Sequence, residues 1–159
     1  MMDESLAIDG REAKSFEEFF ADRFAPLARL AFLLTGSAAV ADEIAQDACE
    51  QVLRRWSDVS FPGAYARVAV VNGSRAWGRR QARSSAYVPE PPGPVMLDSD
   101  AVAVRAALAT LPSTEREVLV LRFYVDLTVD DIARDLKLPS GTVKSHIHRG
   151  LLRMQGELS

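Results

Sequence analysis

The sequence predicts an all-α protein of two small helical domains joined by a proline-rich linker, with a helix-turn-helix in the second domain. Three observations support this prediction. Apolar residues recur at helical spacing on both sides of the centre of the chain, and no segment shows a convincing strand alternation. Four of the eight prolines fall in residues 84–101, where they favour an extended spacer over a helix. The last third contains a short helical pattern, a tight turn and a longer helical pattern.

Composition bounds the class of protein. The 159 residues suffice for one domain or two small ones, and a hydrophobic content of 48% fits a packed protein. The net charge of −3 argues against a free-standing, non-specific DNA binder. The charge is uneven, however: residues 1–22 are acidic, whereas Arg67–Arg83 contains five arginines and no acid, and Arg134–Arg153 contains five basic residues and one acid. This distribution suits a protein that touches DNA locally while bound to a larger basic partner.

The location of the protein follows from what the chain lacks. Its single cysteine, Cys49, cannot form an internal disulfide and is expected to be a small buried side chain rather than a redox group. The acidic segment Met1–Gly10 has no apolar core of a secretory signal. No apolar run approaches the roughly 20 residues that span a bilayer. We therefore expect a cytoplasmic protein.

The first helical domain is expected at residues 15–83, after an acidic, disordered tail of residues 1–14. A helical pattern of phenylalanine and leucine starts at Phe16, and Pro26 predicts a break or bend in it. Thr35-Gly36-Ser37 then combines a stop signal with a start signal.

A second helix is expected from about Ala38 to Trp56, with an apolar residue at every fourth position on one face. Its other face is acidic and polar, with Asp42, Glu43, Gln46, Asp47 and Glu50. Charge on one side of an amphipathic helix is usually a solvated face. This one would also suit docking against a basic helical surface.

A polar loop, Ser57–Gly63, leads to a third helix from about Ala64 to Arg83. Spacings of three, four and four place one polar stripe along it: Asn72, Arg75, Arg79 and Arg83. Arginine and asparagine can contact phosphates and base edges, and interleaved aromatic side chains can stack on unpaired bases. The alternative is an ordinary solvated basic helix with Trp77 in the core. Gly73 and Gly78 weaken the helix by roughly 1 kcal/mol each relative to alanine, so another contact must hold it or require close backbone approach.

The second helical domain, residues 102–159, begins with a helix that Leu111-Pro112 closes. Ser113-Thr114 with Glu117 forms a capping pattern for the next helix, which is expected to end near Asp126. Three apolar residues of that helix are expected to point inward: Val118, Leu119 and Leu121.

The helix-turn-helix follows. Thr128 is expected to cap a helix over Val129–Leu136, Lys137-Leu138-Pro139 makes the turn, and Ser140 starts the final helix. At about 100° per residue, one face of the final helix is apolar, with Val143, Ile147, Gly150, Leu151 and Met154. Another face is polar, with Thr142, Ser145, His146, Arg149 and Arg153. The small Ala133 lets the two helices cross closely, so the final helix can present its polar face to a DNA groove.

Nothing in the chain supports catalysis, a metal or a cofactor. His146 and His148 are two positions apart on a helix and cannot ligate the same metal ion, and no further residues supply the spacing of a zinc site. No phosphate-binding glycine loop or nucleophile elbow is present. We expect a binding protein without cofactor or small-molecule substrate, not an enzyme.

These two units resemble the bacterial extracytoplasmic-function sigma factors of the sigma-70 superfamily, close to an actinobacterial subfamily. The resemblance runs from Phe16 to Met154. In the second unit it rests on the motifs Leu111-Pro112, Glu115-Arg116-Glu117-Val118-Leu119, Leu121-Arg122, Leu127-Thr128, Asp131-Ile132-Ala133, Gly141-Thr142-Val143-Lys144-Ser145 and Arg149-Gly150. In the first unit it rests on Ala41–Ala48 and on Ala64-Tyr65 through Asn72 to Arg79-Arg80.

The resemblance implies region 2 at residues 15–83, a linker at 84–101 and region 4 at 102–159. Region 2 would bind the clamp helices of the largest subunit of RNA polymerase core through Asp42, Glu43, Gln46 and Asp47. It would also contact the melted minus-ten element through Asn72, Arg75, Trp77, Arg79 and Arg80, and its loop Ser57–Gly63 would hold an extruded base. Region 4 would bind the flap of the second largest subunit, and would engage the minus-thirty-five element through Thr142, Lys144, Ser145, His146 and Arg149.

The resemblance thus implies a protein that recruits RNA polymerase core, recognises and melts promoter DNA, and initiates transcription. The linker would thread the RNA channel of the polymerase, and an anti-sigma factor would reuse the same surfaces. The alternative is a stand-alone helix-turn-helix repressor or activator. Such a protein needs DNA affinity of its own and usually a dimer surface. The net negative charge of the chain and its linker argue against both.

Overall fold

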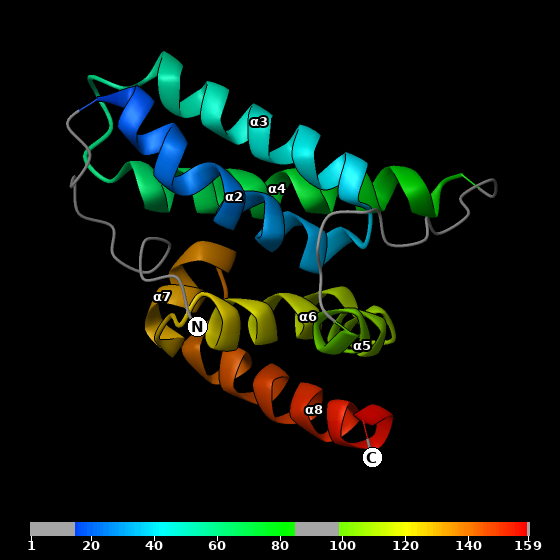
Figure 1. The fold of residues 1–159 in the computed structure, drawn as a ribbon. Coiled ribbons are helices and arrows are strands. Elements are labelled where there is room, and N and C mark those ends of the chain that lie inside the picture. The colour runs from blue at the N-terminus through cyan, green and yellow to red at the C-terminus, as the bar shows by residue number, and fades with distance from the viewer. Residues whose placement is uncertain (1–14, 85–98, 159) are drawn as a thin grey trace. The chain divides into compact units, whose positions relative to one another are not determined.

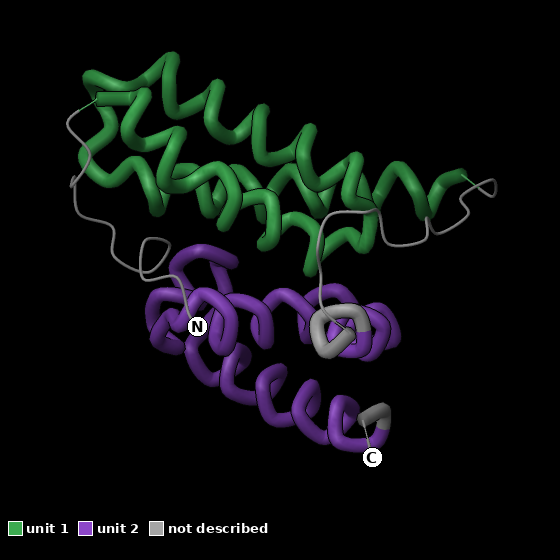
Figure 2. Tube along the Cα trace, in the orientation of Figure 1, with its two compact units in different colours: residues 1, 3–91 green, residues 2, 92–159 purple. Residues whose placement is uncertain are grey.

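The computed structural model describes residues 15–84 and 99–158, and these ranges are helical without a strand. The helices fall into two compact units, one formed by α2, α3 and α4 and the other by α5 to α8 (Figures 1 and 2). The predicted all-α class is therefore confirmed. The expected tail at residues 1–14 and most of the expected linker lie outside the described residues.

In the first unit, α2 spans Phe16–Thr35, α3 spans Ala38–Arg54 and α4 spans Pro62–Ala82. The expected stop and start between α2 and α3 are confirmed. Gly36 adopts the left-handed conformation, with φ of 80°, and donates its N–H to the carbonyl of Phe32 at 2.8 Å. The hydroxyl of Ser37 then caps α3 by accepting the N–H of Val40 at 3.3 Å.

Of the break or bend predicted at Pro26, the break is wrong, because α2 continues through this residue. Proline in a helix interior removes one backbone hydrogen bond. Here Pro26 is buried, and α2 packs against both α3 and α4. Tertiary packing of the apolar face therefore holds the helix across a residue that would interrupt it in isolation.

The core of the first unit is built from side chains of all three helices that are completely buried, among them Leu27, Leu30, Ala45, Val52 and Val70. Cys49 is also buried, as predicted, and burial raises the pKa of its thiol from 9.0 to about 11. The two glycines in the interior of α4 differ in their packing: a Cβ at Gly73 would lie 3.1 Å from Cγ2 of Ile44 on α3, whereas a Cβ at Gly78 would meet nothing within 4 Å.

In the second unit, α5 spans Ser99–Ala109, and α6, Ser113–Leu119, runs directly into the π-helix η1, Val120–Tyr124. The three residues expected to point inward are buried, which confirms that face. The predicted cap by Ser113-Thr114 is wrong: Pro112 is the N-cap residue, and no side chain caps α6.

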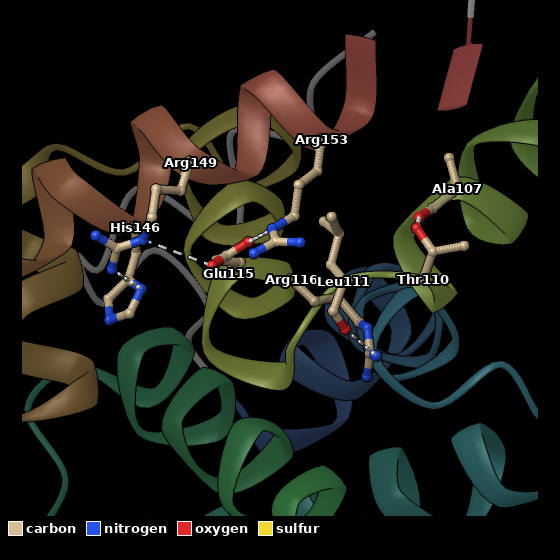
Figure 3. Close-up of polar contacts among 8 residues, drawn as sticks. All are labelled: Ala107, Thr110, Leu111, Glu115, Arg116, His146, Arg149 and Arg153. Carbon is tan, nitrogen blue, oxygen red and sulfur yellow. Dashed lines mark hydrogen bonds and ion pairs between the residues drawn. The ribbon is translucent and has the colours of Figure 1, made fainter. Parts of the chain in front are cut away.

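Arg116 joins the start of α6 to the end of α5. Its guanidinium donates hydrogen bonds to the carbonyls of Leu108 and Leu111, both at 2.9 Å. Figure 3 shows the contact with Leu111. Leu108 lies in the last turn of α5 and Leu111 two residues beyond the helix, where carbonyls lack the partner of a helix interior. The carbonyl of Leu108 also accepts the N–H of Leu111 at 3.1 Å. Burial lowers the pKa of Arg116, and the charge of Glu117 opposes this effect.

The helix-turn-helix has the predicted bounds. Its first helix is α7, Val129–Leu136, and the hydroxyl of Thr128 caps it by accepting the N–H of Asp131 at 3.1 Å. Lys137 makes the turn in the left-handed conformation, with φ of 57°. The final helix, α8, spans Ser140–Leu158.

The apolar face of α8 is narrower than predicted. Val143 and Gly150 are buried and Ile147 and Met154 are half-buried, but Leu151 is exposed. Gly150 permits close packing, since a Cβ at this position would lie 3.0 Å from Cδ1 of Leu119 in α6. A glycine at this contact therefore sets the distance between α6 and α8.

Candidate nucleic-acid interface

The polar face of α8 is accessible over most of its length. Ser145, Arg149 and Arg153 are exposed, and Thr142 and His146 are half-buried. Because these residues recur at intervals of three and four, they lie within an arc of about 100° around the helix. Lys144 is exposed as well, but the same rotation places it away from this arc. The polar face can therefore enter a groove, whereas Lys144 suits contact with a flanking phosphate.

A buried carboxylate lies beneath this face. Glu115 belongs to α6, and its side chain is only 6% exposed. One of its oxygens, Oε1, lies 2.9 Å from Nε of Arg153, and the other, Oε2, lies 3.7 Å from Nε of Arg149 (Figure 3). A buried charge needs such partners, since desolvation of an uncompensated carboxylate is costly. We call Glu115, Arg149 and Arg153 the carboxylate–arginine cluster.

Arg149 also contacts a third residue of the polar face. Its Nη2 donates to Nδ1 of His146 at 3.1 Å (Figure 3). The guanidinium therefore lies between an acceptor on its own helix and a carboxylate from α6. Its side chain is still 49% exposed, so it can contact a ligand from this position.

The neighbouring hydroxyl, that of Ser145, is oriented by its own helix. It donates to the carbonyl of Gly141 at 3.1 Å. The oxygen can still accept a hydrogen bond. Ser140 begins the same helix and donates its hydroxyl to Oδ1 of Asp130 in α7 at 3.0 Å, which ties the two helices of the motif together.

A second candidate surface lies on α4 of the first unit. Asn72, Arg79 and Arg80 are exposed, and Arg75 and Trp77 are half-buried. The alternative expectation that Trp77 belongs to the core is therefore not met. Of the five arginines between positions 67 and 83, Arg67 is only 1% exposed, so it belongs to the interior rather than to this surface.

The loop before α4 presents an aromatic side chain. Phe61 is the N-cap residue of α4 and is 56% exposed, while Pro62 and Gly63, which follow it, are buried. An exposed phenylalanine next to two buried residues offers a flat apolar face on which a base can stack. The resemblance pointed to the loop Ser57–Gly63 as the site of an extruded base, but it did not assign this role to Phe61.

The acidic residues of α3 form a surface of their own. Asp42, Glu43, Gln46 and Asp47 are all exposed, and the intervening residues that face the core are buried: Ala41, Ile44, Ala45 and Ala48. The predicted separation of an apolar and an acidic face is thus confirmed. No group of His, Cys, Asp or Glu within the described ranges could hold a metal ion. Among the described helices, none is long and apolar enough to cross a membrane.

A family model matches the second unit, and curated relatives match most of the chain. Residues 101–154 match the protein family described as "Sigma-70, region 4". The ECF RNA polymerase sigma factor SigL of Mycobacterium tuberculosis is 32% identical over 158 residues, covering 86% of this chain and 85% of the relative. The RNA polymerase sigma-E factor of Streptomyces coelicolor is 29% identical over 155 residues, covering 92% of this chain and 88% of the relative.

Solved structures share the fold. The sigma factor RpoE of Bartonella quintana, solved with the anti-sigma factor NepR, matches with a TM-score of 0.77 and 20% identity over 92% of this chain and 98% of that one. CnrH, solved with the cytosolic domain of CnrY, matches with a TM-score of 0.67 and 22% identity over 90% of this chain and 86% of that one.

Proposed function

The chain belongs to the extracytoplasmic-function (ECF) RNA polymerase sigma factors. We propose which of its surfaces bind the polymerase and which bind promoter DNA during transcription initiation. As a sigma factor it acts in promoter recognition rather than as a stand-alone repressor or activator. Residues 15–83 serve as region 2 and residues 102–159 as region 4. The partners are RNA polymerase core and promoter DNA, so the protein works in the cytoplasm, by binding and not by catalysis.

In this proposal, region 4 reads the minus-thirty-five element with α8. The observation that carries the proposal is the accessible polar face of α8, in which Thr142, Ser145, His146 and Arg149 project from the second helix of a helix-turn-helix. Arg149, half-exposed and oriented, suits a guanine edge. Lys144, outside the arc, suits a phosphate.

Region 2 would hold the melted minus-ten element on α4. Asn72, Arg79 and Arg80 offer exposed donors to phosphates and bases, and Arg75 and Trp77 border them. The loop Ser57–Gly63 would take up an extruded base, with Phe61 as the stacking side chain. Promoter opening then follows because unpaired bases bind better than paired ones, which offsets an unstacking cost of a few kcal/mol per base.

The acidic surface of α3 would dock on the polymerase. Asp42, Glu43, Gln46 and Asp47 are exposed on the face opposite the core, so a basic helical surface such as the clamp helices of the largest subunit can approach all four. The flap of the second largest subunit would bind region 4, and the linker would thread the RNA channel. A sigma factor of the same fold, RpoE, was solved with the anti-sigma factor NepR, which supports a similar inhibitor here.

Run-off transcription with bacterial RNA polymerase core tests the proposal. The full chain should direct transcription from a defined start only when core is present. Promoter binding as tight without core as with it would favour a stand-alone regulator.

A charge reversal tests the docking surface. Asp47→Arg should weaken binding to core by about tenfold, because it places a like charge against the basic partner. Asp22→Arg makes the same change at an exposed position of α2 and should leave core binding unaltered. Equal core affinity of the two variants would remove α3 from the interface.

A further inference from the structure

We propose that Glu115 is a positioning residue for DNA recognition: its buried carboxylate holds Arg149 and Arg153 and thereby sharpens discrimination between promoter sequences. This inference rests on the proposed role of α8 in DNA binding. It concerns a residue on another helix, α6, which lies beneath the polar face and is itself too buried to touch DNA.

The geometry of the carboxylate–arginine cluster gives the two arginines unequal freedom. Nε of Arg153 lies at 2.9 Å from Oε1 of the carboxylate, which makes a close ion pair, although Oε1 accepts no hydrogen bond from the described residues. Nε of Arg149 lies at 3.7 Å, and a second contact, with His146, bounds the same guanidinium from the other side. Arg153 is thus the closer ion-pair partner of Glu115. The guanidinium of Arg149 is confined between Glu115 and His146 but keeps more freedom to move.

Burial explains why this arrangement affects specificity. A buried carboxylate that loses a cationic partner is left with uncompensated charge. When Arg149 turns away to contact any phosphate within reach, it weakens the compensation of Glu115, so contacts that require such a movement are disfavoured. A base contact made from the held position avoids this cost and also loses less side-chain entropy. Glu115 therefore favours one set of contacts over the many that phosphates offer.

Charge reinforces the effect. The cluster combines one carboxylate with two guanidinium groups, so it presents less positive charge to DNA than the two arginines alone. Phosphate attraction is the part of binding that does not depend on sequence. Glu115 reduces this attraction to phosphates while it keeps Arg149 oriented, and so raises the ratio of specific to non-specific affinity.

The test uses the full chain bound to RNA polymerase core. DNA duplexes randomised upstream of the start site are selected for binding to the wild-type complex, and the selected duplex is compared with a scrambled one of the same composition. Affinities for both are measured over a range of salt concentrations for wild type, Glu115→Gln and Asp131→Asn. Asp131 belongs to α7 and pairs with Arg134 at 3.2 Å, outside the cluster, so Asp131→Asn reproduces the change of charge without releasing Arg149.

For Glu115→Gln we expect affinity for the scrambled duplex to rise about fivefold at physiological salt, with a salt slope steeper by about one contact. The ratio of selected to scrambled affinity should fall about tenfold. Asp131→Asn should raise non-specific affinity without lowering that ratio. A ratio in Glu115→Gln equal to that of Asp131→Asn would overturn the positioning role, as would an equal loss of affinity for both duplexes. If the wild-type complex selects no sequence, both the inference and the proposed function fail.

A second variant keeps the test decisive if Glu115→Gln does not fold. Arg153→Gln removes the firmer arginine and leaves Arg149 as the arginine of the cluster, so Glu115 should hold Arg149 more closely. We expect weaker binding to the scrambled duplex and a ratio no lower than that of wild type. A fall of the ratio would show that Arg153 itself reads bases and would overturn the inference.

Discussion

The packing of α4 on α3 can be tested by replacing its two interior glycines with alanine, one at a time. Gly73 and Gly78 both lie within α4, so each replacement gains about 1 kcal/mol of helix propensity. Their surroundings differ. The new methyl group at position 78 meets nothing within 4 Å, whereas that at position 73 lies 3.1 Å from Cγ2 and 3.7 Å from Cγ1 of Ile44.

The expected magnitudes follow from these distances. Ile44 is 8% exposed and packed in the core, so it can yield only by moving α3 or leaving its preferred rotamer, and such overpacking costs about 1–3 kcal/mol. Gly73→Ala should therefore lower the free energy of unfolding of the first unit by up to about 2 kcal/mol. Gly78→Ala should raise it by about 1 kcal/mol, equivalent to about 4–8 °C in Tm for a unit of this size.

Urea denaturation followed by tryptophan fluorescence measures these changes. The two tryptophans of the chain, Trp56 and Trp77, both lie in the first unit, so the signal reports that unit alone. Equal stabilisation by both replacements would refute the reasoning, because it would show that the α3–α4 distance adjusts freely to an added methyl group.

Three further predictions concern single residues. Arg149→Ala should weaken binding to the selected minus-thirty-five element by about 1–3 kcal/mol, whereas Lys144→Ala should weaken binding to every duplex alike; competition binding separates the two. The buried thiol of Cys49 keeps its proton up to a pH of about 11, while the unfolded chain loses it near 9.0. The free energy of unfolding should therefore fall by about 2–3 kcal/mol across this range, a fall that Cys49→Ala removes in urea titrations at each pH. Arg116→Met should destabilise the second unit by about 2–3 kcal/mol, since two carbonyls lose a charged donor; circular dichroism during thermal unfolding should show it.

The helices and most of their ends could be predicted from the amino-acid sequence, because they depend on neighbours a few positions away. Ser37 and Thr128 cap the helices that follow them, and the bounds of α7 were predicted to the residue. The apolar and acidic faces of α3 follow in the same way from helical periodicity. The resemblance to sigma factors was likewise carried by local motifs, and the identity with a curated relative confirms it.

Features that depend on residues far apart in the chain could be seen only in the folded protein. Packing carried α2 through Pro26, brought the Arg116 guanidinium to the carbonyl of Leu108 in α5, and left Leu151 exposed. It also placed Glu115 beneath Arg149 and Arg153, a contact that no periodicity reveals. Hydrophobic spacing specifies which face of a helix turns inward, but the distance and rotation between two helices depend on the shapes of all the side chains packed between them.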